Sequence, residues 1–143
     1  MFFGEFEHAV DLKGRIILPA KFRDAFAEGA FVTKVIDGCL AVYTPTEFDL
    51  LAREMQEKAR RGLVQRSVTR TFAAGTAEVL PDRQGRIALP QNLRSFAELT
   101  DRVTVTGQIN RLEIWDAEKW SRVNREGEAA MNDPDAGLDD MTI

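Results

Sequence analysis

The chain has 143 residues, of which 44% are hydrophobic and 29% are charged, as is usual for a globular protein. It contains no apolar run of about 20 residues, and its first residues lack the basic start and apolar core of a secretory signal. One cysteine and one histidine argue against a disulfide framework and a His/Cys metal site, and the net charge of −4 on its face argues against a nucleic-acid partner. We therefore expect a cytoplasmic protein with no cofactor and no metal.

The first predicted elements form a hairpin followed by a short helix. An extended segment at Glu5–Val10 runs into a tight turn at Asp11–Gly14. Glycine offers a positive φ in such a turn, and the aspartate side chain can accept hydrogen bonds from the turn backbone. An apolar strand at Arg15–Leu18 follows, Pro19 ends it, and a short helix is predicted over Ala20–Phe26.

The next predicted elements are two strands, at Phe31–Val35 and Cys39–Tyr43, joined by a glycine turn. Thr44 and Glu47 then have the spacing of a helix capping box. Apolar residues at helical spacing predict one buried face of that helix: Phe48, Leu51, Ala52, Met55 and Ala59. A second helix, over Val64–Ala74, is expected to connect this half of the chain to the other half.

The sequence then repeats itself. Residues 4–23 read GEFEHAVDLKGRIILPAKFR and residues 75–94 read GTAEVLPDRQGRIALPQNLR, with nine identical positions out of twenty. The second copy therefore predicts the same elements: strands, short helix, two strands and a capped helix. These fall at Thr76–Leu80, Arg86–Leu89, Gln91–Ala97, Val103–Thr106, Leu112–Trp115 and the helix after Asp116.

The last 18 residues contain six acids and neither lysine nor arginine, and the rest of the chain then carries 19 bases against 17 acids. Net charge therefore does not decide the partner. We expect a module at 5–47, a helical linker at 48–75, a second module at 76–119, the end of a helix at 120–128 and a disordered acidic tail at 129–143.

Each unit of about 45 residues is too small to hold a stable core of its own. Pairing the two units into one closed body would supply that core and protect the strand edges. The predicted fold class is therefore α+β, with two ββαββ-like units that could interleave into one closed body.

The two turns carry the candidate binding residues. Lys13 and Arg15 in the first copy, and Arg83 and Arg86 in the second, are cations on a rigid hairpin, suited to phosphate or base-edge contacts. The alternative is that Arg15 and Arg86 only brace their turns through ion pairs with Asp11 and Asp82. The turn-shaping residues are Asp11, Gly14, Asp82 and Gly85.

Other charged residues have structural interpretations. Arg23 and Arg94 also repeat, and we expect each to form an internal ion pair. Six bases between Arg53 and Arg70 indicate a solvated helix face or, alternatively, a phosphate-facing stripe. Catalytic motifs are not found, and we expect no enzyme activity, no catalytic residue and no small-molecule substrate.

These motifs resemble one known family. Four segments carry the resemblance: FFGEFEHAVDLKGRIILPAKFR, VIDGCLAVYTPTEF, DRQGRIALPQNLR and NRLEIWDAEKW. They are similar to MraZ, a family of bacterial transcription regulators encoded at the head of the division and cell-wall gene cluster. The resemblance covers about residues 1 to 125.

The resemblance implies two SpoVT/AbrB-like modules folded together as a pseudo-dimeric β-barrel with flanking helices. It implies a ring-shaped homo-oligomer that binds short direct repeats in the promoter of its own operon and represses it, in the cytoplasm and at the nucleoid. Carried over by residue, Lys13 and Arg15 are the strongest DNA contacts. Gln84 replaces the lysine in the second copy, so weaker contact is expected there. The alternative function is a protein-interaction scaffold or antitoxin-like module.

Overall fold

The computed structural model describes residues 1–139 and 141, and within them the two copies have the same order of strands. The first copy contributes β1 (Glu5–Ala9), β2 (Arg15–Ile17), β3 (Ala30–Lys34) and β4 (Leu40–Tyr43). The second contributes β5 (Ala77–Val79), β6 (Arg86–Ala88), β7 (Arg102–Gly107) and β8 (Leu112–Asp116). Each strand lies within one or two residues of its predicted position.

Helical segments connect and flank the strands. They are the 3₁₀ helices η1 (Ala20–Phe26) and η2 (Pro134–Ala136) and the α-helices α1 (Pro45–Arg60), α2 (Arg66–Gly75), α3 (Gln91–Phe96) and α4 (Ala117–Met131). The first short helix, η1, was expected, and the structure shows that it is of the tighter 3₁₀ type.

The strands of the two copies are interleaved. A six-stranded antiparallel sheet has the order β1-β7-β8-β4-β3-β5, and β2 pairs with β6 in a separate two-stranded sheet. First-copy β1 therefore pairs with second-copy β7, while second-copy β5 pairs with first-copy β3. Exchanging the copies turns the strand order into its own reverse, so a pseudo-twofold axis passes between β4 and β8 and between β2 and β6.

Both copies share one hydrophobic core. Ile16 on β2 faces Ile87 on β6, and both are essentially inaccessible to solvent. They pack in one cluster with residues of the six-stranded sheet, among them Val32, Val105 and Ile114. The α+β fold of two interleaved modules, expected from the undersized repeats, is therefore confirmed.

The longer helices begin where the sequence predicts. Thr44 Oγ1 accepts a hydrogen bond from the Glu47 amide at 3.3 Å, and the Asp116 side chain accepts one from the Lys119 amide at 3.5 Å. Gly62, with a φ of +76°, follows the end of α1 in the conformation that favours glycine.

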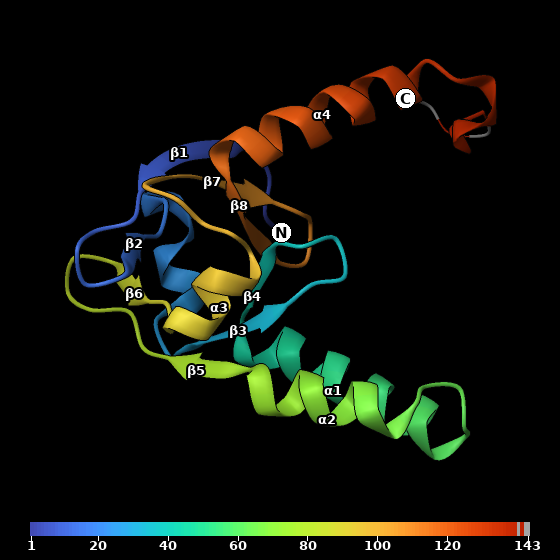
Figure 1. The fold of residues 1–143 in the computed structure, drawn as a ribbon, viewed down its shortest axis with the longest axis horizontal. Coiled ribbons are helices and arrows are strands. Elements are labelled where there is room, and N and C mark those ends of the chain that lie inside the picture. Colours follow the sequence, from blue (N-terminus) through green and yellow to red (C-terminus); the bar gives the residue numbers. More distant parts are fainter. Residues whose placement is uncertain (140, 142–143) are drawn as a thin grey trace.

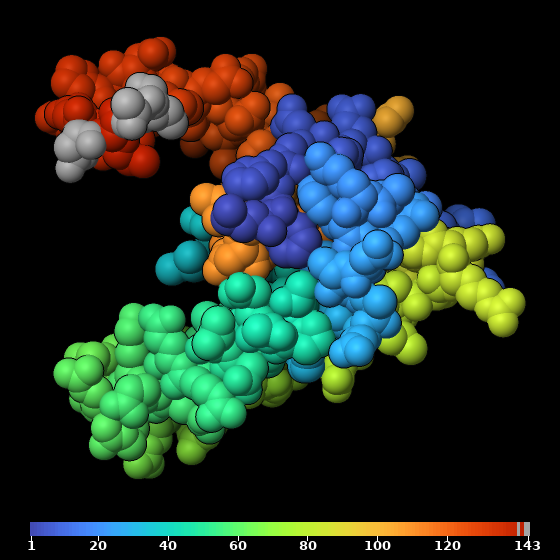
Figure 2. Space-filling model, turned by 180° about the vertical axis from the view of Figure 1, so that it is seen from behind, coloured from blue at the N-terminus to red at the C-terminus, as the bar shows by residue number. Residues whose placement is uncertain are grey.

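Two helical arms project from this body. The hairpin of α1 and α2 extends from one end and α4 from the other, both toward the same side of the molecule (Figure 1). The rear view shows open space between them (Figure 2). Helix α4 continues to Met131, past the expected end at residue 128, and η2 lies within the segment expected to be disordered. Residues 140, 142 and 143 of that segment lie outside the described residues.

Candidate nucleic-acid interface

The Asp11–Arg15 turn is built around one carboxylate. Asp11 Oδ1 accepts hydrogen bonds from the amides of Lys13 at 2.9 Å and Arg15 at 2.8 Å, and Oδ2 accepts one from Arg15 Nε at 2.7 Å. The Gly14 amide donates to the Asp11 carbonyl at 2.9 Å, and Gly14 has a φ of +76°. The Asp11 amide donates to the Arg15 carbonyl at 2.9 Å and closes a tight loop with a left-handed residue at its end, a geometry that glycine adopts without steric cost. The expected hairpin is not formed by the flanking strands, because β1 pairs with β7 and β2 with β6.

The second turn has the same three hydrogen bonds to its aspartate. Asp82 Oδ1 accepts from the amides of Gln84 and Arg86, each at 2.9 Å, and Oδ2 accepts from Arg86 Nε at 2.7 Å. Gly85 has a φ of +79°. The residue at the tip does not matter to this network, since Lys13 and Gln84 both contribute only their backbone amides.

The hydrogen bonds keep both aspartates ionised. The Arg15 amide is the main cause that lowers the pKa of Asp11, and the Arg86 amide does the same for the pKa of Asp82. The paired guanidinium adds to this effect in each turn. Each carboxylate accepts three hydrogen bonds from donors of its own turn, one of them from the guanidinium of its paired arginine.

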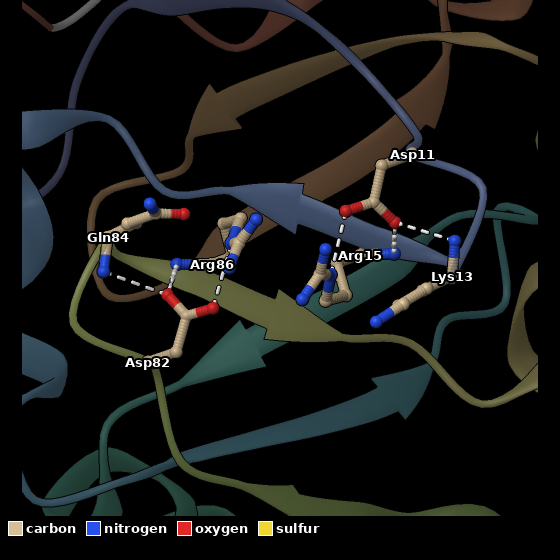
Figure 3. A network of polar contacts seen from close by, with 6 residues as sticks. All are labelled: Asp11, Lys13, Arg15, Asp82, Gln84 and Arg86. Carbon is tan, nitrogen blue, oxygen red and sulfur yellow. Dashed lines mark hydrogen bonds and ion pairs between the residues drawn. The ribbon is translucent and has the colours of Figure 1, made fainter.

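The two arginines lie on the same face of the small sheet. Arg15 is paired with Ala88, and Arg86 is paired with Ile17, so the two arginines are diagonal neighbours on adjacent antiparallel strands. Figure 3 shows both side chains on one side of β2 and β6, with the two turns at opposite ends of the ribbon. The opposite face holds the buried Ile16 and Ile87.

Both ion pairs that the sequence offered as a bracing role are present. Arg15 and Arg86 nevertheless bind their aspartates only through Nε. Their side chains are 26% and 31% exposed to solvent. Within the described residues, no hydrogen bond from the terminal nitrogens of either guanidinium to a protein group is found. Bracing the turn and contacting a ligand are therefore compatible roles.

Two further cations lie within the exposed turns themselves. Lys13 and Arg83 are exposed, and no ion pair involving either is found in the described part of the chain. All four predicted contact residues therefore lie on one two-stranded ribbon and its turns: Lys13, Arg15, Arg83 and Arg86. Figure 3 shows three of them, Lys13, Arg15 and Arg86. Cations gathered on one ribbon can attract the negative charges of a nucleic-acid backbone.

The expectation of internal ion pairs for Arg23 and Arg94 is wrong. Each guanidinium instead lies against the turn glycine of the other copy: Arg23 against Gly85, and Arg94 against Gly14. Arg23 Nε donates to the Leu18 carbonyl at 3.1 Å, whereas Arg94 Nε is buried without a hydrogen-bond partner among the described residues. These crossed contacts support both turns, and nothing in the local sequence signals them because the partners are 62 and 80 residues apart.

The basic stretch on α1 and α2 is a different surface. Its first half is neutralised by i,i+3 or i,i+4 ion pairs of Arg53 with Asp49, Lys58 with Glu54 and Arg60 with Glu57. This agrees with the solvated-face interpretation for α1. The stretch is on the helical hairpin, away from the β2–β6 ribbon (Figure 1).

Two further reactive side chains are His8, which is half-buried, and Cys39, which is buried. Burial lowers the pKa of His8, with a contribution from Arg23, and burial raises the pKa of Cys39 to about 12. Among the described residues, no group of three or more His, Cys, Asp or Glu side chains is arranged to hold a metal ion. In the same part of the chain, no helix combines the length and apolarity that crossing a membrane requires.

Comparison with known proteins agrees with this arrangement. The family model described as "MraZ protein, putative antitoxin-like" matches the chain twice, over residues 1–71 and over residues 72–141. A protein named transcriptional regulator MraZ, from Finegoldia magna (strain ATCC 29328 / DSM 20472 / WAL 2508), is 36% identical over 143 residues, the full length of both chains. The chain belongs to the MraZ family.

The two matches of the MraZ model confirm the internal duplication, because they divide the chain inside α2, the helix that joins the copies. Membership of MraZ also assigns the chain to a class, the transcriptional regulators. Which residues of an MraZ protein meet its target is a separate question, for which the β2–β6 ribbon is the candidate.

Proposed function

We propose that this chain is a sequence-specific DNA-binding regulator that contacts promoter DNA through the β2–β6 ribbon. One observation supports the proposal: two turns with equivalent hydrogen bonds place Lys13, Arg15, Arg83 and Arg86 on one ribbon, while each turn aspartate is bound by donors of its own turn. Arginine can bind a guanine edge or a phosphate in bidentate fashion, and lysine adds a point charge to the phosphate.

The proposed mechanism relies on avidity. A single ribbon offers few phosphate contacts, so one chain would bind weakly. A homo-oligomeric ring presents many ribbons, and tandem direct repeats in the promoter of its own operon would then be bound at high effective concentration. Repeats spaced by about one helical turn, roughly 10 bp, would present the same groove to successive chains. Such binding would repress the division and cell-wall genes of that operon, at the nucleoid in the cytoplasm.

Lys13 and Gln84 provide a matched test of this interface. Both occupy the same position in equivalent turns, and both side chains are exposed and not used in the turn network. Lys13→Ala therefore removes a charge without removing a structural contact, and Gln84→Ala is the neutral control. The measurement is a titration of DNA from upstream of the gene, by gel shift, at several salt concentrations.

We expect Lys13→Ala to weaken binding at every salt concentration and to reduce the slope of log affinity against log salt by about one phosphate contact, roughly 0.9. Gln84→Ala should retain the wild-type slope. Identical slopes for the two variants would exclude Lys13 from the interface. An absence of promoter binding by the wild type even at low salt would favour the protein-interaction alternative.

A further inference from the structure

Helices α1 and α4 are equivalent in the two copies, but only α1 is covered along its length. Phe48 corresponds to Trp120, and Met55 and Ala59 correspond to Gly127 and Met131. Met55 and Ala59 are half-buried, whereas every residue of α4 from Arg125 onward is exposed. The outer half of α4 thus lacks the packing that its counterpart has.

The difference has a simple structural cause. In the first copy, α2 folds back along α1, and the Phe72 ring lies 6.0 Å from the Phe48 ring in a stacked arrangement. Among the described residues, no helix packs on α4 in the same way. A hollow of about 530 Å³ remains beside α4, lined by Trp115, Trp120, Val123 and Gly127 among others.

The charges on the two arms are complementary. The tip of the α1–α2 hairpin, residues 58–70, contains five bases and no acids, and will be called the basic tip. The outer part of α4 and the segment after it, residues 126–139, contain five acids and no bases, and will be called the acidic arm. Arg61, Arg66 and Arg70 have no ion pair within the described part of the chain, and neither has Glu126 or Glu128.

Both arms also expose apolar side chains. Leu63 and Val68 on the basic tip are 64% and 50% exposed, and Met131 on the acidic arm is 57% exposed. Burial of these groups together with opposite charges would stabilise a contact between the arms. The two arms of one chain point away from its body and are separated by open space (Figures 1 and 2), so they do not meet within that chain.

We propose that the acidic arm of one copy docks on the basic tip of a second copy. The basic tip of that second copy then lies beside α4, as α2 lies beside α1 within one chain. The contact joins two different surfaces, so each chain can bind one neighbour with its tip and another with its arm. Contacts of this head-to-tail kind close into a ring when the rotation between neighbours allows it. The inference rests on the oligomer proposed above and names the surface that forms it.

The test exchanges the charges of the two surfaces. Arg66→Glu with Arg70→Glu reverses the basic tip, and Glu126→Lys with Glu128→Lys reverses the acidic arm. A fourth protein carries all four substitutions, so opposite charges again face each other. Asp24→Lys with Glu28→Lys is the control, since it makes the same charge change at exposed positions of the body. Mass is measured by light scattering at low salt without DNA, and circular dichroism checks the fold.

We expect the wild type and the control to form the same oligomer, each single-surface reversal to shift the mass toward that of one 16.1 kDa chain, and the fourfold variant to recover the oligomer. Unchanged mass in either reversal, or no recovery in the fourfold variant, would overturn the proposed surface while leaving the oligomer itself in place. A monomeric wild type would overturn both. Because DNA is absent, none of these results depends on the β2–β6 ribbon.

Discussion

Arg23 lies so close to Gly85 of the other module that a Cβ added at Gly85 would be 2.3 Å from Arg23 Nε. The reciprocal contact is nearly as close, because a Cβ at Gly14 would be 2.6 Å from Arg94 Cζ. Each turn glycine is therefore required twice, once for its left-handed backbone and once for the guanidinium packed against it.

Gly85→Ala should destabilise the protein by more than its backbone conformation alone explains. A non-glycine residue in the left-handed region costs roughly 1–2 kcal/mol. Moving Arg23 would also break its hydrogen bond to the Leu18 carbonyl, with a further loss of about 1 kcal/mol. Urea unfolding followed by circular dichroism measures the sum.

Gly62→Ala is the control for this comparison, because Gly62 has a φ of +76° and an added Cβ would meet no atom within 4 Å. Gly62→Ala should therefore lower the free energy of unfolding only by the cost of the left-handed backbone conformation. Equal losses at Gly62 and Gly85 would show that the Arg23 contact contributes nothing to stability.

The shared core predicts that the two modules unfold together. Ile16→Ala and Ile87→Ala remove side chains that face each other across β2 and β6, and each should cost about 2–5 kcal/mol. Ile36→Ala, at a residue that is 99% exposed, should change the free energy of unfolding by less than about 0.5 kcal/mol. Calorimetry should give a single transition for each variant, and two resolved transitions would contradict the interleaved core.

Local signals predicted most of the elements but not their partners. Apolar alternation, Pro19 and the Thr44 cap are short-range features, and they located the strands and helices within a residue or two. The pairing of β1 with β7 joins residues about a hundred positions apart. No local pattern encodes such a pairing, which followed only from the argument that two undersized copies must share a core.

Gln84→Lys should strengthen DNA binding if the ribbon is the interface. The change gives the second turn a cation at the position equivalent to Lys13, next to Arg83, and the turn geometry is preserved because only the amide of residue 84 is used. One added phosphate contact should steepen the salt dependence by about 0.9. Glu28→Gln is a useful comparison, since it makes the same change of +1 in charge at an exposed position outside the ribbon and outside both arms, and it should leave affinity unchanged. A wild-type slope for Gln84→Lys would place residue 84 outside the contact.

Cys39 should react with thiol reagents only when the protein opens. Burial, with a smaller effect of the Glu113 carboxylate, raises its pKa from 9.0 to about 12, which leaves roughly 1,000-fold less thiolate at about pH 8. Labelling of the native protein should therefore be very slow and should become rapid in denaturant. Cys39→Ala combined with Ser121→Cys places the thiol at an exposed position of α4 and should label at once. Rapid labelling of native Cys39 would contradict its burial.

The geometry of the two turns was predicted better than their support, whereas the DNA contacts of the four cations remain a prediction. The Asp-x-x-Gly-Arg repeats predicted both turns, because the interactions within each turn span at most four positions. Arg23 and Arg94 were assigned to ion pairs because their actual partners, glycines of the opposite copy, leave no charge pattern in the sequence. The contacts of Arg23 with Gly85 and of Arg94 with Gly14 can be recognised only in the folded structure, where the two copies lie against each other.

The unequal turn tips give the ribbon a polarity. In a true dimer of identical modules, both ends of the two-stranded ribbon would be the same, and a target would be bound equally well in either orientation. Here duplication within one chain has left a lysine at the tip of one turn and a glutamine at the tip of the other. A ligand lying along the ribbon therefore meets a different end in each direction, and under the proposed function this asymmetry predicts a preference for direct repeats over palindromes.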